Sequence, residues 1–493
     1  MRQTAKESKW VGSKTGWVTG IFVFASMLLL PTPEGLSVEA WRVAALASLM
    51  VVLWVTEAIP IAATAMLPIV LLPLMRIAPI NEAVIPYSHP IIFLFMGGFI
   101  VALAMERWNF HKRIALFVLS LGGERPNMLV AAFMAVSAFL SMWVSNTATT
   151  LMMLPIAVSV IGTLNLSKSN KSIEPGLAKA LMLGLAYGAT AGGMATLVGT
   201  PPNAFVAGFI KQTYEVEIGF VDWALVALPL SLIMLIAIWT LLTKVIYKIG
   251  RQPISGLRDS IIQERQDLAS PSRGELTVAI VFLSLAVLWV LRPWINSVIP
   301  ELGLTDTVIA MAVGLSTFLI PVDLKRGIFL MDWDWGKKIP FGILLLFGGG
   351  LSLASSIDRT GLSVWIGGQL ESLGMFPTIM IIFTMVLMII LITELTSNTA
   401  TTATFLPVVG ALAISLGEHP LLLVVPATLA VSCAFMLPVA TPPNAIVFSA
   451  GYLNQRDMMQ AGIWLNMFGL ILVTAAAYSL LLWVFNIQAG IGI

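Results

Sequence analysis

Apolar residues in this sequence form long runs, separated by short joints rich in charge, proline or glycine. About 20 apolar residues suffice for a helix to cross a bilayer. Residues 127–167, 180–210 and 419–455 contain no Asp, Glu, Lys or Arg at all. The pattern predicts an all-α polytopic membrane protein with about 11 transmembrane helices. The expected spans are 17–31, 40–57, 60–75, 91–108, 178–198, 222–245, 275–292, 305–321, 340–357, 420–440 and 461–486.

Two further apolar stretches, 127–163 and 376–416, are interrupted in the middle by clusters of Ser, Asn and Thr. Each stretch is long enough for two half-spans but slightly short for two complete crossings, which remain the alternative. A re-entrant hairpin that enters and leaves on one face fits better, because the polar cluster then lies at mid-depth. The sequence therefore predicts two re-entrant hairpins in addition to the spans.

Three sequence blocks occur twice in the same order, about 240–250 residues apart, as internal repeats do. The pairs are 145–150 (SNTATT) with 397–402 (SNTATT), 199–204 (GTPPNA) with 440–445 (ATPPNA), and 94–98 (LFMGG) with 345–349 (LLFGG). Five expected spans separate the two hairpins. Because five is odd, the hairpins enter from opposite faces, and the halves are predicted to form inverted-topology repeats.

Composition supports a membrane protein and excludes several other classes. Hydrophobic residues make up 58% and charged residues 11% of the 493 positions, whereas soluble domains carry about a quarter charged residues. A net charge of +2 gives no reason to expect a nucleic-acid partner. One cysteine, Cys433, excludes a disulfide framework, and three scattered histidines do not predict a metal cluster. We find neither a nucleophile with its base nor a metal-ligand set, so no enzyme is expected.

Basic residues predict the orientation in the membrane. They gather in 107–113, 168–179, 244–273 and 323–338, which all lie on one face if the N-terminus is cytoplasmic; Arg76 and Arg359 are exceptions. The basic start and the apolar stretch 17–30 resemble a signal peptide but are not followed by a small-residue cleavage site. We therefore expect a retained first helix and a multi-pass protein of the inner membrane, with its N-terminus inside.

The two Thr-Pro-Pro-Asn blocks predict broken helices within the membrane. A Pro-Pro pair removes two backbone donors and disfavours helix in the preceding residue, which should leave carbonyls of 198–200 and 439–441 unpaired. Such broken helices in matching positions of two repeats indicate a transporter binding site. Neither Ser-Asn-Thr motif contains Lys or Arg, so neutral donors would hold an anion whose charge co-bound cations offset. Proton coupling usually needs a buried Asp, Glu or His to relay protons, whereas these motifs offer mainly uncharged oxygen ligands. They therefore favour Na⁺ over H⁺ as the coupling ion.

Two acidic residues lie within the predicted membrane segments. Glu394 comes three residues before Ser397 and could be either a functional acid or a residue that packs or pairs at the hairpin base. Glu57, in a Thr-Glu-Ala-Ile-Pro segment, is expected at a short turn on the inner side.

At its paired motifs the sequence resembles the divalent-anion:sodium symporter family of di- and tricarboxylate and sulfate carriers, over nearly the whole chain. The resemblance implies a homodimer in which a mobile domain slides against a scaffold, the elevator mechanism. It divides the chain into scaffold helices in 1–120 and 274–370, transport-domain parts in 121–245 and 371–493, and a cytoplasmic connecting arm in 246–273.

The resemblance also assigns residues to sites. One sodium site would comprise Ser141, Ser145, Asn146 and the backbone of Gly199; the other Thr393, Thr396, Asn398 and the backbone of Ala440. Substrate carboxylates would meet Asn146, Thr147, Thr200, Pro201, Asn398, Thr399, Thr441 and Pro442. Ser141 precedes Ser145 by four residues, as Thr393 precedes Ser397, which predicts that each pair shares a helical face. Because Gly199 and Ala440 would bind sodium through their backbones, the replacement of glycine by alanine in the second site should be tolerable.

The function expected from these features is sodium-coupled symport of C4-dicarboxylates such as succinate, malate or fumarate, with no organic cofactor. A sodium-independent dicarboxylate exchanger, a sulfate symporter and a tricarboxylate carrier of the same fold remain alternatives. An anion channel is a further alternative from another class, although hairpins from opposite faces favour alternating access over a continuous pore.

Overall fold

A computed structural model of the chain describes residues 14–121, 125–166, 175–250, 253, 270–370 and 374–487. Residues 1–13 and most of the predicted arm 246–273 lie outside this part. In the first half the helices are α1 (Lys14–Leu29), α2 (Val38–Val55), α3 (Ile61–Ala65), α4 (Leu67–Leu74), α5 (Ile80–Val84), α6 (Pro90–Arg107), α7 (Phe110–Leu121), α8 (Pro126–Ser141), α9 (Asn146–Leu166), α10 (Pro175–Gly193), α11 (Pro201–Tyr214) and α12 (Phe220–Thr240). In the second half they are α14 (Arg273–Val298), α15 (Asp306–Leu319), α16 (Trp333–Gly336), α17 (Phe341–Arg359), α18 (Leu362–Gln369), α19 (Thr378–Thr393), α20 (Asn398–Ser415), α21 (Leu421–Val431), α22 (Pro442–Ser449), α23 (Gln455–Ala476) and α24 (Leu482–Val484).

The helices follow the apolar runs of the sequence. Among the described residues, six helical stretches are long and apolar enough to cross a membrane. Shorter apolar helices occupy the predicted spans 17–31, 60–75, 305–321 and 420–440, both arms of the first hairpin and the first arm of the second. Helix α10 lies at the predicted span 178–198, and α20 forms the second arm of the second hairpin. The predicted span 60–75 consists of two short helices, α3 and α4, which meet at a turn at Met66. Pro68 starts the second of them, since proline is favoured in a first helical turn.

A small β-hairpin corrects the all-helical expectation. Strands β1 (Pro321–Asp323) and β2 (Ile328–Phe329) pair antiparallel between the predicted spans 305–321 and 340–357, where the sequence pattern predicts no strand. The turn between them forms because Asp323 accepts hydrogen bonds from the backbone of Lys325 (3.1 Å) and Arg326 (3.2 Å), and Gly327 adopts φ 65°. Both devices stabilise tight turns.

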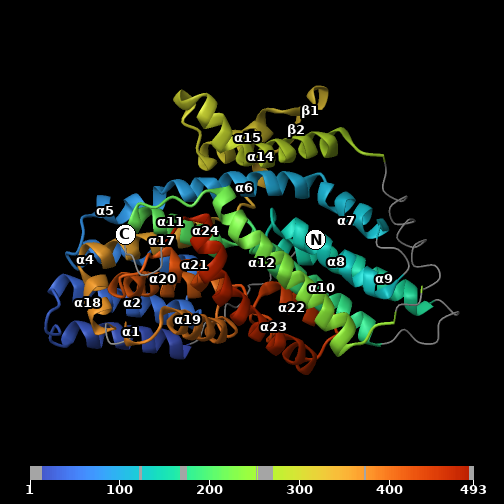
Figure 1. Cartoon of the computed structure of the whole chain (residues 1–493). Coiled ribbons are helices and arrows are strands. Elements are labelled where there is room, and N and C mark those ends of the chain that lie inside the picture. Colours follow the sequence, from blue (N-terminus) through green and yellow to red (C-terminus); the bar gives the residue numbers. More distant parts are fainter. Residues whose placement is uncertain are drawn as a thin grey trace, which may run out of the picture.

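Glycines from the repeated Leu94–Gly98 and Leu345–Gly349 blocks bring helices into close contact. A Cβ on Gly97 of α6 would lie 2.5 Å from the carbonyl carbon of Ala310 in α15, and one on Gly349 of α17 would overlap the backbone of Ala65 in α3. Small residues allow such backbone approach in membrane proteins. Figure 1 shows the result for the first block, with α6 running beneath the α14–α15 pair. The two blocks therefore serve helix packing in both halves.

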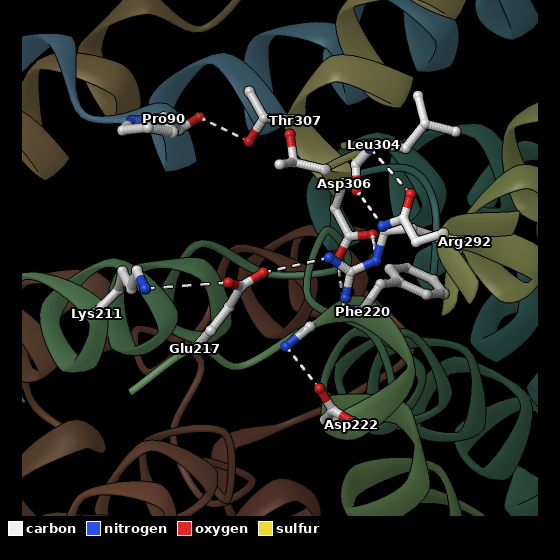
Figure 2. Close-up of polar contacts among 12 residues, drawn as sticks. Pro90, Lys211, Glu217, Phe220, Asp222, Arg292, Leu304, Asp306 and Thr307 are labelled. Atoms are coloured by element: carbon white, nitrogen blue, oxygen red, sulfur yellow. Dashed lines mark hydrogen bonds and ion pairs between the residues drawn. The ribbon is translucent and has the colours of Figure 1, made fainter. Parts of the chain in front are cut away.

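An ion-pair network joins the α11–α12 connection to helices α14 and α15 (Figure 2). Arg292 contacts Glu217 (Nη1–Oε1 3.2 Å) and Asp306 (Nε–Oδ1 3.0 Å). Asp306 also accepts a hydrogen bond from the backbone N–H of Phe220 at 2.8 Å. The first and second halves of the chain are thus held together at this end by charged groups rather than by apolar packing alone.

Candidate functional site

The first Ser-Asn-Thr motif forms the turn between α8 and α9. Helix α8 ends at Ser141, and α9 begins at Asn146 after a short turn. Ser145 caps the N-terminus of α9, because its Oγ accepts a hydrogen bond from the backbone N–H of Ala148 (3.3 Å). The hydroxyl of Ser141 donates to Oδ1 of Asn146 at 2.5 Å, which fixes the orientation of the amide.

The second motif repeats this geometry between α19 and α20. Thr393 ends α19 and donates to Oδ1 of Asn398, the first residue of α20, at 2.7 Å. The hydroxyls of Thr396 and Thr401 are 2.6 Å apart. The prediction that Ser141 and Ser145, or Thr393 and Ser397, share a helical face is wrong, because each helix ends at the first member of its pair. The hydroxyl instead pairs with the asparagine five residues on.

Both Thr-Pro-Pro-Asn blocks lie where a helix is broken and resumes. The chain leaves α10 after Gly193 and re-enters a helix, α11, at Pro201; it leaves α21 after Val431 and re-enters α22 at Pro442. The breaks are thus where the proline pairs predicted them but begin several residues earlier. Gly193, the last residue of α10, lies close to the first turn, because a Cβ there would overlap the side-chain amide of Asn146.

The asparagine of each block binds the carbonyls that the break frees. Asn203 is fully buried, and its Nδ2 donates to the carbonyls of Gly193 (3.1 Å), Met194 (3.2 Å) and Thr196 (2.7 Å). Asn444 donates in the same way to Ala434 (3.3 Å) and Leu437 (3.0 Å). These two asparagines were missed as positioning residues, although their presence in both repeats was a signal that could have identified them.

The two turns and the two breaks meet at one cavity of about 670 Å³. Its lining includes nearly all of the predicted site residues: Ser145, Asn146, Thr147, Gly199, Thr200, Pro201, Thr396, Asn398, Thr399, Ala440, Thr441 and Pro442. Ser141 and Thr393 are fully buried behind Asn146 and Asn398 and do not line it. The lining also contains three further motif residues, Ser397, Pro443 and Ala445. Outside the motifs it contains Val55, Thr56, Glu57, Ile61, Ile343, Leu395 and Val439.

Four helix N-termini open onto this cavity. The first residues of α9, α11, α20 and α22 are Asn146, Pro201, Asn398 and Pro442, and each is part of the lining. Helix N-termini present unpaired N–H groups and the positive end of the helix dipole, and so attract anions. Among the lining residues, Glu57 alone has a charged side chain. An anion in this cavity would therefore be held by neutral dipoles, without an arginine or lysine.

Glu394 lies in the second turn but faces away from the cavity lining. Its side chain is buried, and its carboxylate accepts hydrogen bonds from the backbone of Met436 (2.9 Å) and Leu437 (3.0 Å) and from Nδ2 of Asn466 (2.6 Å). Oδ1 of Asn466 in turn accepts from the backbone of Phe435 at 3.3 Å. Of the two roles left open for Glu394, this geometry favours pairing at the hairpin base, where it fixes the broken segment after α21.

The family whose model is described as "Sodium:sulfate symporter transmembrane region" matches residues 13–486 of this chain. The chain belongs to this family. Membership confirms the resemblance drawn from the paired motifs, and it identifies this symporter-family protein as a multi-pass membrane transport protein and not an enzyme.

Relatives of this family member cover almost its full length. The "Sodium-dependent dicarboxylate transporter SdcS" of Staphylococcus saprophyticus is 37% identical over 95% of this chain and 92% of its own. The protein of the same name from Staphylococcus aureus strain RF122 is also 37% identical, over 95% of this chain and 91% of its own.

Solved structures of lower identity show the same general fold. The YdaH transporter of Alcanivorax borkumensis aligns with a TM-score of 0.54 and 14% identity over 81% of this chain and 86% of its own. MtrF of Neisseria gonorrhoeae, placed in a class of antimetabolite efflux pumps, aligns with a TM-score of 0.56 and 11% identity over 97% of each chain. At these identities the likeness concerns the fold alone.

Proposed function

We propose that this protein is a sodium-coupled symporter of C4-dicarboxylates such as succinate, malate and fumarate. One observation carries the proposal: four helix N-termini and both Ser-Asn-Thr turns meet in a cavity whose motif residues are all uncharged. Such a site suits a small anion whose charge must be offset by something other than a basic side chain. The names of relatives at 37% identity, sodium-dependent dicarboxylate transporters, support both the substrate and the ion.

The substrate carboxylates would bind the two turns and the two breaks. One carboxylate would accept hydrogen bonds from the amide of Asn146 and the hydroxyl of Thr147, and the other from Asn398 and Thr399. The loops at Thr200–Pro201 and Thr441–Pro442 would close the site from the opposite side. Hydrogen bonds from neutral donors to a carboxylate are worth about 1.5–3 kcal/mol each, enough for specific recognition without a cation on the protein.

Each sodium ion would bind behind the substrate, between a turn and a break. The first site would use Ser141, Ser145, Asn146 and the Gly199 carbonyl, and the second Thr393, Thr396, Asn398 and the Ala440 carbonyl. Hydrogen bonds from Ser141 and Thr393 to the adjacent amides support this grouping. Because each amide serves both an ion and the substrate, bound Na⁺ would orient the group that recognises the anion, which couples the two.

The same proposal extends to topology and motion. Eleven spans and two re-entrant hairpins in inverted repeats, an inner-membrane location, a cytoplasmic N-terminus, a homodimer and an elevator mechanism are inferred together. Residues 1–120 and 274–370 would form the scaffold, 121–245 and 371–493 the moving domain, and 246–273 the connecting arm. The helix–turn–helix units α8–α9 and α19–α20 and the matching breaks support the repeat.

Labelled-succinate uptake into proteoliposomes tests the proposal. We expect concentrative uptake driven by an inward Na⁺ gradient with no substrate inside. Uptake that ignores Na⁺ but requires internal dicarboxylate would instead identify an exchanger. Accumulation of sulfate that succinate does not inhibit would identify a sulfate symporter. An ohmic anion current would identify a channel.

Variants at the amides test the site. Asn146→Ala and Asn398→Ala should each lower succinate affinity about tenfold or more, because each removes a donor to the carboxylate. Asn127→Ala, which removes a buried amide from α8 outside the cavity lining, is the matched control and should transport normally. Unchanged transport in both cavity variants would refute the site assignment.

A further inference from the structure

Glu57 occupies a backbone position that does not suit it. It follows the end of α2, where the N–H of Glu57 bonds to the carbonyl of Trp54 (3.3 Å) and the N–H of Ala58 to that of Leu53 (3.2 Å). This pair of bonds is the Schellman ending of a helix, whose left-handed residue is usually Gly or Asn. Glu57 is that residue, with φ 47°. A Cβ disfavours this conformation, so the backbone here would accept glycine more readily.

The charge of Glu57 is also unfavourable at this end of the helix. The C-terminus of a helix carries a partial negative charge, which favours Lys, Arg or His and disfavours carboxylates. Two local preferences therefore oppose glutamate at one position. Residues in locally unfavourable conformations concentrate at functional sites. The surroundings of the Glu57 side chain are therefore relevant to function.

The side chain of Glu57 faces the proposed substrate site. It is exposed, and it lines the same cavity as both Ser-Asn-Thr turns. Within the described part of the chain, no ion pair or hydrogen bond neutralises its carboxylate, whereas Glu82, Glu217 and Glu275 each pair with an arginine. An anion in the cavity would therefore meet one full, uncompensated negative charge from the protein.

We propose that Glu57 weakens dianion binding on the cytoplasmic face and so promotes substrate release there. In the proposed topology the N-terminus is cytoplasmic and α1 and α2 each cross the membrane, so Glu57, just after α2, lies on the cytoplasmic face. This rests on the proposed function, in which α2 belongs to the scaffold and the dianion to the moving domain. The repulsion then acts only while the site faces this side, and it is absent once the moving domain has carried the site away from α2. The result is lower affinity on the release side without loss of affinity on the uptake side.

The test compares the two faces of the membrane. Succinate KM is measured in inverted vesicles, which present the cytoplasmic face to the medium, and in right-side-out vesicles. Both are prepared from cells that express wild type or Glu57→Gln, with saturating Na⁺ on the substrate side. We expect Glu57→Gln to lower KM in inverted vesicles by on the order of fivefold, as removal of one nearby charge in a hydrated cavity should. KM in right-side-out vesicles should stay at the wild-type value.

Control variants separate charge from backbone strain. Glu57→Gly removes both the charge and the Cβ and should match Glu57→Gln, and Glu57→Asp should match wild type. Glu39→Gln removes an exposed carboxylate from the other end of α2, away from the cavity, and should change nothing. The gap between wild type and Glu57→Gln should also narrow when choline chloride raises the ionic strength at constant Na⁺.

Each outcome bears on one proposal at a time. An equal KM for wild type and Glu57→Gln in inverted vesicles, or an effect of Glu57→Gly alone, would overturn the electrostatic role of Glu57 while leaving sodium-coupled transport intact. A change confined to right-side-out vesicles would overturn the inference as well, because the carboxylate would then act on the uptake side. Loss of Na⁺-driven uptake in wild type would instead reject the proposed function itself.

Discussion

Removal of the charge on Glu394 should loosen the broken segment after α21. Both carboxylate oxygens are in use: one accepts from the Met436 N–H and from Asn466, and the other from the Leu437 N–H. In Glu394→Gln, one oxygen becomes an NH₂ group. If the remaining oxygen keeps the two bonds to Met436 and Asn466, the NH₂ group meets the Leu437 N–H, and donor faces donor.

The magnitude follows from that loss. One hydrogen bond to a charged group is worth about 1.5–3 kcal/mol, and a buried donor left unpaired costs a similar amount. We therefore expect local opening of this segment to become about 2–3 kcal/mol easier, which is roughly a 30- to 150-fold increase in the open population. Glu394→Ala should exceed this, because all three donors then lose their acceptor.

The only cysteine of the chain reports this opening. Cys433 is fully buried and lies within the segment that Glu394 holds. A thiol-reactive maleimide dye, applied to detergent-solubilised protein, should label Cys433 roughly 30- to 150-fold faster in Glu394→Gln than in wild type, provided that opening and closing are fast relative to labelling. Glu275→Gln, which changes another buried carboxylate in the distant helix α14, should leave the labelling rate unchanged. Equal labelling of Glu394→Gln and wild type would refute the structural role of Glu394.

Two further predictions concern packing and charge. Gly199→Ala should reduce Na⁺-dependent succinate uptake by at least tenfold, because a Cβ there would overlap the carbonyl of Gly193. This geometry corrects the expectation that glycine and alanine are interchangeable at this position. Ala440→Gly should transport normally, and similar uptake by the two variants would contradict the asymmetry. Arg292→Leu should destabilise the protein by about 2–4 kcal/mol, since it leaves the carboxylate of Asp306 without its cation. A thermal-unfolding midpoint that did not fall relative to wild type would show that the pair contributes little.

Much of the helical framework could be predicted because its signals are local. Apolar runs locate helices by length and composition alone, and the helix breaks follow from proline pairs whose effect on the backbone is intrinsic. The close approach of Gly193 to the amide of Asn146 could not be predicted, because the two residues come from different helices. The β-hairpin after α15 was missed although Asp323 and Gly327 carried its turn signal.

The residues of the candidate site that belong to the duplicated motifs could be predicted. Asn146 and Asn398 belong to duplicated motifs, and both line the cavity. The helical-face argument for Ser141 and Ser145 failed because it assumed that α8 continues through the motif, whereas the motif itself ends the helix. Glu57 belongs to no repeated block, and its exposure to the cavity depends on how α2 packs against α20 of the second hairpin. Sequence periodicity contains no such information.

The two halves of the candidate site share their motif residues but differ in the residues that lie outside the motifs. The motif residues give the cavity two matched half-sites, each with a hydroxyl on an asparagine and an asparagine on the carbonyls of a broken helix. A site composed of these residues alone would offer an anion similar surroundings from either side. Glu57 adds one negative charge from outside the motifs, on the side that α2 contributes. Gradients set the direction of net transport, but a charge on one side alone can set different affinities for the same substrate on the two faces of the membrane.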